Sequence, residues 1–466
     1  MSLPDRTALD ALTGRLNNLL GADGVAVSQD LRNAHAADAS HHQPAVPDVV
    51  AFPANTDEVA QIVTLCAKQQ VPIVPFGTGT GIEGGVVAER GGVCIDTSRM
   101  NNVLRVSTAD MDATIEAGVT RNQLNRQLAE SGTDLHFRVD PGADASLGGM
   151  AATCASGSSA VRYGTMRQNV LALTVVLADG RVIRTGTRAR KSSAGYDLTS
   201  LFVGSEGTLG VITEVTVRLA RLPEAVSAAV CDFADVDSAV AAAIEAIAAG
   251  IPMARLEMLD EVQIDAVNRY SHLDYKVTPT LFLEFHGTPA GVAEQAERAG
   301  EILSGHGGGV FRWATQEEEC TRLWQARYDA YYASLALREG GAGYVTDVCV
   351  PISQLAECIR RTKRELAGTK IPAPLYGHVG DGNFHVVFVI DPNSTEELRG
   401  VEELSRRIVA HALELDGTCT GEHGIGLGKL DALIQEHGEA VDVMRSLKRA
   451  LDPHNLMNPG KVLRVD

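Results

Sequence analysis

Two histidines flank a glycine-rich turn in the segment GHVGDGNFH, residues 377–385. Asp-Gly pairs mark tight turns, and the flanks APLYGHV and NFHVVFVI are apolar and β-branched, as strands are. The pattern predicts a hairpin with Asp381-Gly382 at its tip, in which His378 directly faces His385. Directly opposed residues have Cβ atoms about 4.5–5.5 Å apart, so two imidazoles at this spacing can share one metal ion. The alternative is an ordinary turn whose histidines are only surface or core residues.

An acid and a third histidine lie side by side in the segment GTCTGEHGIGLGK. Adjacent residues of a regular strand point to opposite faces, so Glu422 and His423 reach one site only through irregular backbone, which the surrounding glycines permit. His378, His385 and Glu422 would then form a two-histidine, one-carboxylate set suited to a divalent metal with open positions. His423 would remain as a general base. Alternatively, Glu422 is a surface acid and His423 a core histidine.

Three glycine-rich segments precede these residues: PFGTGTGIEGG, DPGADASLGGMAATCASG and GYDLTSLFVGSEGTLGVIT. The first lacks both the following helix of a Rossmann fingerprint and the Gly-Lys-Ser/Thr of a Walker A loop. A run of backbone N–H groups in a glycine nest suits a pyrophosphate instead. One such loop can be merely a turn. Three loops, each followed by strand signals, favour a large ligand whose diphosphate and rings touch several of them.

The bulk composition narrows the functional classes. A chain of 466 residues predicts two or three domains, and its net charge of −18 argues against nucleic acid and anionic membrane surfaces as partners. The eight cysteines include no CxxC pair, so no thiolate zinc site or iron–sulfur cluster is indicated, and free thiols favour a cytoplasmic protein. The N-terminal segment resembles no signal peptide, and no apolar run is long enough to make a transmembrane segment.

The elements that would position the glycine loops lie within residues 46–222. NTDEVAQIVTLCAKQQ predicts a helix capped by Asn55 or Thr56, and VTRNQLNRQLAESG predicts a second helix capped by Thr120. VLALTVVLADGRVIRTG predicts a hairpin that turns at Asp179-Gly180, and LGVITEVTVRL alternates like a strand. These elements make an α+β block.

The elements that would position the histidines follow from residue 223. Strands are expected near residues 226–233, 253–258, 281–286, 309–313 and 343–350, and helices near 237–249, 291–304, 353–366 and 395–415. Paired strand–helix–strand units on either side of a central helix, RLWQARYDAYYASLAL, indicate a duplicated ferredoxin-like layer with helices on one face of an antiparallel sheet. We expect domains at 1–222 and 223–448, and a return of 449–466 onto the first domain.

Together with VRYGTMRQNV and the tail NPGKVL, these segments resemble the FAD-linked 2-hydroxyacid dehydrogenases of the vanillyl-alcohol oxidase/p-cresol methylhydroxylase (PCMH) superfamily. The resemblance covers about residue 46 to the end of the chain. It implies an α+β fold, with a PCMH-type FAD-binding core at about 46–222 and a ferredoxin-like cap domain. The loop GTGTG contains no His or Cys that could attach a flavin, so the FAD is expected to be non-covalent. GYVTDVCVPIS is similar to the branch that oxidises D-lactate.

The resemblance also implies roles for single residues. His378, His385 and Glu422 would bind zinc or manganese, His423 would be the catalytic base, and Arg327 would clamp the substrate carboxylate with its guanidinium fork. From composition alone, Arg327 is instead a helix-surface arginine. The residues expected to contact FAD lie in or beside the glycine loops and the tail: Pro75, Gly77, Thr78, Gly79, Thr80, Gly81, Pro141, Gly142, Ser146, Gly148, Gly149, Ala155, Ser156, Gly157, Glu206, Gly207, Ile212 and Asn458.

The reaction implied by the resemblance is oxidation of a D-2-hydroxyacid, first of all D-lactate to pyruvate. The metal would chelate the substrate, His423 would take the hydroxyl proton, and hydride would pass to flavin N5. Related D-2-hydroxyglutarate dehydrogenases carry Lys and Asn near Thr346 and Val387 for a second carboxylate. Their absence predicts a small substrate, because an unpartnered buried carboxylate is costly. A cytochrome, a quinone, an electron-transfer flavoprotein or oxygen would accept the electrons, and a position peripheral to the inner membrane is compatible.

Other functions remain open on the sequence. A D-2-hydroxyglutarate or glycolate dehydrogenase of the same family would differ in substrate profile. A metal-dependent hydrolase would use the two-histidine, one-glutamate set without flavin and would be colourless. A flavin-binding electron-transfer module or binding subunit would show no flavin reduction by any 2-hydroxyacid. Neither the hydrolase nor the module needs the glycine loops and the metal set together.

Overall fold

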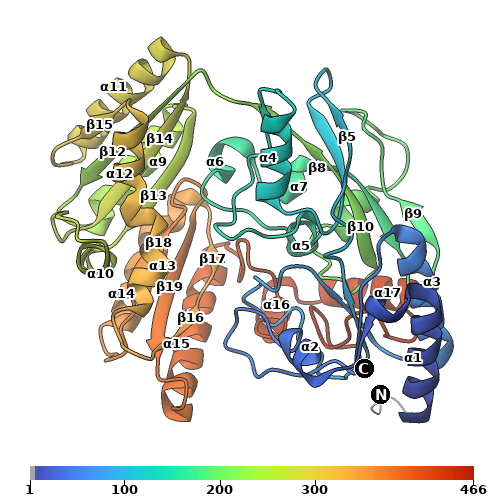
Figure 1. Ribbon diagram of the computed structural model, residues 1–466. Coiled ribbons are helices and arrows are strands. Elements are labelled where there is room, and N and C mark those ends of the chain that lie inside the picture. The colour runs from blue at the N-terminus through green and yellow to red at the C-terminus, as the bar shows by residue number, and fades with distance from the viewer. Residues whose placement is uncertain (1–5, 466) are drawn as a thin grey trace. The chain divides into compact units, whose positions relative to one another are not determined.

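The computed structural model describes residues 6–465, and the chain divides into two compact units (Figure 1). Residues 1–5 and Asp466, which the domain prediction included, lie outside the described part. The first unit takes in the chain up to residue 156, residues 165–222 and the chain from residue 422 onward, and the second unit takes in residues 157–164 and 223–421. The chain therefore returns to the first unit at Glu422, earlier than the predicted residue 449. The cause is a set of bonds from the residues after Glu422 to loops of the first unit.

The first unit contains a four-stranded sheet with the strand order β1-β2-β4-β3. Its strands are β1 (Val25–Ala26), β2 (Val49–Ala51), β3 (Ile73–Phe76) and β4 (Val93–Asp96). Strand β4 pairs in parallel with β2 and β3, and helix α3 (Thr56–Gln69) supplies the crossover that parallel strands require. Asn55 caps α3 by accepting a hydrogen bond from Glu58 N, as predicted. Helix α1 (Arg6–Leu20) packs beside α3.

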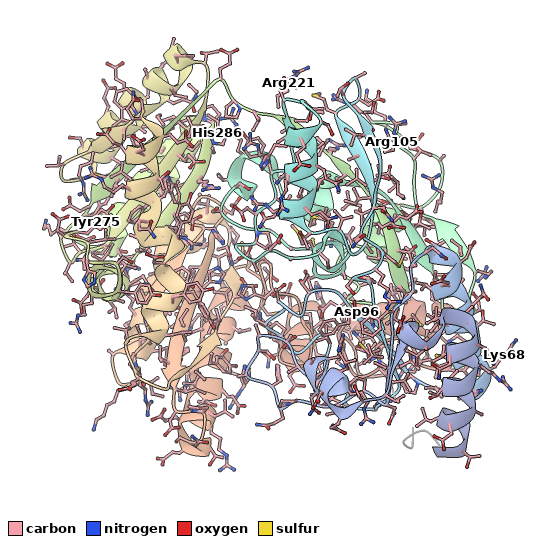
Figure 2. All side chains as sticks on the ribbon, in the orientation of Figure 1. Lys68, Asp96, Arg105, Arg221, Tyr275 and His286 are labelled. Carbon is pink, nitrogen blue, oxygen red and sulfur yellow. The ribbon has the colours of Figure 1, made fainter. Side chains whose placement is uncertain are left out.

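Asp96, at the end of β4, also binds the segment around His35, which precedes β2 in the chain. His35 follows helix α2 (Gln29–Ala34), and its Nε2 lies 2.7 Å from a carboxylate oxygen of Asp96, which Figure 2 labels. The hydrogen bond to Asp96 outweighs burial and raises the pKa of His35 above its ordinary value of 6.5. A charged, buried pair of this kind fixes the segment that leads into β2.

The second sheet of the first unit is antiparallel throughout, with the order β5-β6-β10-β8-β9. Its strands are β5 (Val103–Ser107), β6 (Asp112–Glu116), β8 (Val170–Val176), β9 (Val182–Arg184) and β10 (Val211–Arg218). The β8–β9 turn contains Gly180 at a φ of 84°, as the Asp-Gly pair predicts. Thr120 caps helix α4 (Arg121–Glu130) by accepting from Gln123 N, also as predicted.

Short elements complete the first unit, and its tail pairs with the first sheet. They are the 3-10 turn η1 (Ala22–Gly24), β7 (Leu135–His136), α5 (Leu147–Thr153), α7 (Met166–Asn169), α8 (Leu198–Phe202), β11 (Ala220–Arg221), α16 (Leu430–His437) and α17 (Ala440–Leu451). After α17, Ile73 N donates to Leu456 O at 2.8 Å and Asn458 N donates to Ile73 O at 2.7 Å. The tail therefore lies along the edge of β3.

The second unit is built on one antiparallel sheet with the order β15-β12-β14-β13-β18-β19-β16, and β17 also pairs with β19. Its strands are β12 (Ala225–Asp232), β13 (Met253–Leu259), β14 (Thr280–Gly287), β15 (Arg312–Ala314), β16 (Ala342–Val345), β17 (Val348–Cys349), β18 (Leu375–Gly377) and β19 (Asn383–Ile390). The pairing of β13 with β18 joins the two predicted strand–helix–strand halves. The antiparallel sheet was therefore predicted correctly.

Helices cover both faces of this sheet, although the sequence predicted one helical face. Trp324 of α12 (Glu317–Tyr328) packs with Val230 and Phe282 on one face, beside α10 (Glu261–Ser271) and α13 (Ala330–Leu335). Strand alternation turns Cys231 to the other face, where it lies near the end of α11 (Pro289–Gly305). The remaining helical elements are α6 (Ala160–Tyr163), α9 (Val236–Ala248), η2 (Ile352–Gln354), α14 (Leu355–Leu366) and α15 (Thr395–Glu414). Within residues 6–465, no helix has the length and apolar character needed to cross a membrane.

Candidate functional site

The histidine hairpin forms, but its predicted register is wrong. Tyr376, not His378, pairs with His385. The tip is the longer loop 378–382, because Gly380 N donates to Leu256 O of β13 and draws the tip toward that strand. The shift of register leaves each histidine on its predicted face. The two rings therefore still meet, with centroids 5.4 Å apart and planes at 82°.

Both histidines have a defined tautomer. His378 Nδ1 lies 2.6 Å from Glu257 Oε1, and His385 Nδ1 lies 3.1 Å from the carbonyl oxygen of Thr346. A carboxylate and a carbonyl can only accept, so each Nδ1 donates, and in the neutral ring Nε2 carries the lone pair. A ligand atom of one ring lies within 4.8 Å of a ligand atom of the other. Imidazoles oriented by such Nδ1 partners are typical of metal-ligating histidines.

Glu257, which no sequence motif singles out, links His378 to Arg327. Its side chain is 0% exposed and also accepts from Arg327 Nε at 2.7 Å. Burial alone would raise the pKa of Glu257, but the charges of His378 and Arg327 outweigh burial and lower it. Arg327 also stacks over the ring of Tyr376, at 5.1 Å from the centroid. Arg327 is therefore a positioned guanidinium beside the histidine hairpin and not a helix-surface arginine.

A second buried acid, Asp347, holds the chain that leads to Glu422. The predicted strand 343–350 breaks there into β16 and β17. Asp347 accepts from Asn383 Nδ2 and from Thr420 Oγ1, each at 2.8 Å. A Cβ on Gly421 would lie 2.3 Å from Asn383 Nδ2, so only glycine fits this close approach. The last residues of the second unit are thus fixed next to the histidine hairpin.

Glu422 and His423 open the returning segment of the first unit, with His423 Nε2 3.8 Å from Glu422 Oε1. The buried carboxylate of Glu206 accepts from Ile425 N at 2.7 Å and Gly426 N at 2.9 Å. Burial raises the pKa of Glu206 to about 7, although the two N–H donors act to lower it. The predicted metal set is therefore divided, with two histidines in the second unit and the acid in the first.

The loop predicted to bind pyrophosphate follows β3 in the first unit. Between residues 6 and 465, no hydrogen bond uses the backbone N–H groups of residues 77–81. Gly79 has a φ of 67°, and a Cβ on Gly77 would lie 2.3 Å from Ser146 Oγ, so the loop is packed against the cap of α5. A run of unused N–H groups in such a loop is the donor set that a pyrophosphate needs. The residues present therefore fit the nucleotide.

The remaining predicted FAD residues fall into three groups. Gly148, Gly149, Ala155 and Ser156 lie on α5 or just after it, Pro141 and Gly142 lie on the loop before it, and Gly157 belongs to the second unit. Gly207 packs on Pro75, and Ile212 lies on β10. Asn458 Nδ2 donates to Gly85 O at 2.9 Å and to Glu206 O at 2.7 Å. Asn458 and Glu206 thus bond to backbone of the first unit, a role that their glycine-rich surroundings did not indicate.

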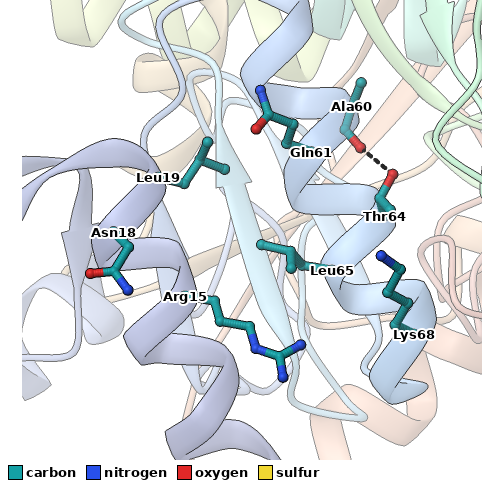
Figure 3. Close-up of a pocket in the computed structure, with 8 residues that line it drawn as sticks. All are labelled: Arg15, Asn18, Leu19, Ala60, Gln61, Thr64, Leu65 and Lys68. Carbon is teal, nitrogen blue, oxygen red and sulfur yellow. Dashed lines mark hydrogen bonds between the residues drawn. The ribbon is translucent and has the colours of Figure 1, made fainter.

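A surface groove of about 550 Å³ lies elsewhere in the first unit, between α1 and α3 (Figure 3). It is lined by Arg15, Asn18, Leu19, Ala60, Gln61, Thr64, Leu65 and Lys68. The one hydrogen bond drawn there joins the Thr64 hydroxyl to Ala60 O within α3. None of the predicted site residues is in this lining, which contains no acid, histidine or cysteine. The groove therefore offers no candidate for the chemistry.

Comparison with known proteins finds family matches over most of the chain. Residues 47–186 match the model of an FAD binding domain, and residues 222–462 match the C-terminal domain of FAD linked oxidases. The chain is 52% identical over 462 residues to "Probable D-lactate dehydrogenase, mitochondrial" of Danio rerio, covering 98% of this chain and 93% of that protein. The chain belongs to the FAD-linked oxidases. It is accordingly an oxidoreductase, and FAD is its cofactor.

One further sequence relative and one solved structure are similar to this FAD-linked oxidase over most of its length. It is 46% identical over 455 residues to "D-lactate dehydrogenase [cytochrome], mitochondrial" of Arabidopsis thaliana, covering 97% of this chain and 80% of that protein. The crystal structure of p-cresol methylhydroxylase with substrate bound superposes with a TM-score of 0.82 at 18% identity, covering 99% of this chain and 98% of that one. The PCMH-type fold that the family resemblance implied is confirmed.

One prediction is overturned by these relatives. Scattered cysteines favoured a cytoplasmic protein, and none of the eight cysteines, all of which lie within residues 6–465, forms a disulfide. Both named relatives are mitochondrial, however, so the cytoplasmic assignment is wrong. Free thiols report a reducing environment, and that property does not separate one reducing compartment from another.

Proposed function

We propose that this FAD-linked oxidase oxidises a small D-2-hydroxyacid, D-lactate in the first place, at a divalent metal held by His378, His385 and Glu422. The observation that carries the proposal is the pair of Nδ1 hydrogen bonds, which orients Nε2 of both buried histidines as the atom a metal would bind. The names of the relatives, which are D-lactate dehydrogenases, support the choice of substrate.

Chain connectivity supports the addition of Glu422 to the two histidines. Consecutive Cα atoms are 3.80 Å apart across a trans peptide bond, and Gly421 is packed against Asn383, within the histidine hairpin. Glu422 directly follows Gly421 in the chain, and His423 is the second residue after Gly421. On the other side, Glu206 binds Ile425 N and Gly426 N within the first unit.

The chain's own residues then have distinct tasks. FAD, when bound, supplies the hydride acceptor, and a divalent metal such as zinc or manganese supplies Lewis acidity at the substrate hydroxyl. His423 accepts the hydroxyl proton. Arg327, with Nε bound to Glu257, binds the substrate carboxylate through Nη1 and Nη2. The N–H groups of residues 77–81 bind the pyrophosphate of the nucleotide.

The surroundings of Thr346 and Val387 favour a substrate with one carboxylate. The Thr346 hydroxyl accepts from Val386 N, and Val387 is fully buried in the apolar core of the sheet. Neither residue offers a cation, so the second carboxylate of hydroxyglutarate would gain no partner here and would pay a desolvation cost. For the electrons, the name of the Arabidopsis relative favours a cytochrome over a quinone or an electron-transfer flavoprotein.

Anaerobic flavin reduction tests the proposal. The purified protein is mixed with D-lactate, L-lactate, glycolate or D-2-hydroxyglutarate, each with and without a chelator, and the flavin absorbance is followed. We expect rapid bleaching by D-lactate that the chelator abolishes. Faster bleaching by hydroxyglutarate would refute the argument from Thr346 and Val387. Bleaching that persists after complete removal of metal would refute the proposed metal requirement. No bleaching by any of the four acids would refute the proposed substrate class.

A further inference from the structure

We infer that Glu257 is a positioning residue that couples metal binding to binding of the substrate carboxylate. The inference rests on the proposed function, because it takes His378 as a metal ligand and Arg327 as the carboxylate clamp. Its structural basis is one buried side chain with two cationic or potentially cationic partners. Oε1 lies 2.6 Å from His378 Nδ1, and Oε2 lies 2.7 Å from Arg327 Nε.

The location of Glu257 makes this arrangement rigid. It lies on β13, where it pairs with Phe282 of β14, and strand backbone of this kind is a firm support. Its side chain is 0% exposed, so water cannot replace either partner. Arg327 comes from α12, and His378 from the loop after β18. Glu257 is thus the common acceptor for donors from two other elements.

Each of the two hydrogen bonds has a separate effect. The bond to His378 keeps the proton on Nδ1, and so keeps the Nε2 lone pair for a metal. The bond to Arg327 occupies Nε and directs the terminal N–H₂ groups as the donors for a carboxylate. The carboxylate also places a negative charge between a guanidinium and a divalent cation, which would otherwise repel each other in a region of low dielectric.

A shared acceptor implies reciprocal coupling. If a metal on His378 favours, through Glu257, the orientation of Arg327 that binds the carboxylate, it strengthens substrate binding by some factor. By linkage, the substrate carboxylate must then strengthen metal binding by the same factor. Glu257 would therefore affect metal affinity in the absence of substrate, and also KM.

The decisive variant is Glu257→Gln. In the wild type each carboxylate oxygen accepts from one partner, and the amide replaces one of these oxygens by an N–H₂ donor, which cannot accept from His378 or from Arg327. If the amide N–H₂ meets His378 Nδ1, the ring proton must move to Nε2, where it blocks the metal. We expect Zn²⁺ and Mn²⁺ affinity of the FAD-loaded enzyme to fall about 10–100-fold, the usual effect of losing such a partner. Equilibrium dialysis with metal analysis measures this without substrate. KM for D-lactate should rise as well.

A matched control is available on the same unit. Glu365 of α14 also accepts from a histidine and an arginine, His411 at 3.1 Å and Arg407 at 3.2 Å. Glu365→Gln therefore removes the same type of carboxylate bridge at a different place, and it should leave metal affinity and KM unchanged. Glu257→Asp keeps the charge with a shorter reach, and it should recover part of the metal affinity lost in Glu257→Gln.

The outcomes separate the inference from the proposed function. Wild-type-like metal affinity in Glu257→Gln, in a wild type that binds metal and is reduced by D-lactate, overturns the inference alone. No metal binding by the wild type overturns the proposed function and the inference together. If Glu257→Gln does not fold, Glu257→Asp decides, because unchanged metal affinity and unchanged KM in that variant would overturn the coupling.

Discussion

His385 and Thr346 are joined by a hydrogen bond of 3.1 Å from the imidazole Nδ1 to the backbone carbonyl. A carbonyl acceptor fixes the ring without adding charge, whereas the corresponding partner of His378 is the carboxylate of Glu257. A charged acceptor makes the stronger hydrogen bond. The two histidines are therefore held differently: Nδ1 of His378 meets a carboxylate directly, whereas Nδ1 of His385 meets the carbonyl and has the carboxylate of Asp347 farther away, at 3.7 Å.

The first prediction concerns His385 itself. His385→Ala should lower metal affinity by at least about 100-fold, since loss of a ligand exceeds the 10–100-fold effect of losing a ligand's partner. The flavin should stay bound, because the loop of residues 77–81 belongs to the other unit. Metal analysis and the visible flavin spectrum of the same sample measure both quantities. His411→Ala, on α15, serves as the control. A full metal content in His385→Ala would remove His385 from the ligand set.

The second prediction concerns the carboxylate clamp. Arg327→Lys keeps a positive charge but loses the planar fork that can hold Glu257 and a substrate carboxylate at once. We expect KM for D-lactate to rise about 10–100-fold, equivalent to about 1.4–2.8 kcal/mol, while kcat changes less. Steady-state kinetics at saturating metal separate the two. An unchanged KM would show that another group binds the carboxylate.

The histidine hairpin shows how far local sequence signals reach. The alternation of side chains along a strand fixed the faces of His378 and His385, and the Asp-Gly pair located the turn. The register failed because Gly380 N bonds to Leu256 O in β13. That strand is distant in the sequence, and nothing within the segment GHVGDGNFH reports its presence. The face of the sheet on which a side chain lies is set by its position along the strand. The pairing register of that strand depends on every strand that borders it.

The partners of the buried acids were not predicted, for a related reason. Glu257 and Glu206 are remote in the sequence from the groups they hold, His378 and the backbone N–H groups of Ile425 and Gly426. An acid within the apolar strand MARLEML signals a buried charge that needs a partner. That signal does not identify the partner. The candidate ligands could therefore be named from sequence, but the residues that orient them required the tertiary structure.

The third prediction tests the pyrophosphate loop. A Cβ on Gly77 would lie 2.3 Å from Ser146 Oγ, so Gly77→Ala must displace the hydroxyl that caps α5 through Gly149 N. We expect a lower flavin content after purification and a loss of about 0.5–2 kcal/mol from the cap. The ratio of flavin to protein absorbance gives the first quantity, and chemical denaturation gives the second.

Gly14→Ala is the matched control for Gly77→Ala. Gly14 lies in the exposed part of α1, and an added Cβ there meets nothing within 4 Å. It should keep the flavin and gain stability from better helix propensity, by about 0.5–1 kcal/mol. Full flavin in both variants would exclude the loop of residues 77–81 as a tightly packed cradle.

The fourth prediction is a pH dependence that arises from Glu206. Burial raises its pKa from an ordinary 4.5 to about 7, against the N–H groups of Ile425 and Gly426. Between these two values the folded protein keeps a proton that the unfolded chain has released. The free energy of unfolding must therefore fall as the pH rises from about 4.5 to about 7, by about 3 kcal/mol in total for this group.

Glu206→Gln isolates this contribution. Glutamine does not titrate, so the variant lacks the fall, while every other titrating group is shared with the wild type. We expect the stability of the wild type relative to Glu206→Gln to decrease across the pH 4.5–7 interval and to level off above it. Urea denaturation of both proteins at several pH values measures the difference. A difference that does not change with pH would mean that the two backbone N–H donors keep Glu206 ionised, and that burial does not control its proton.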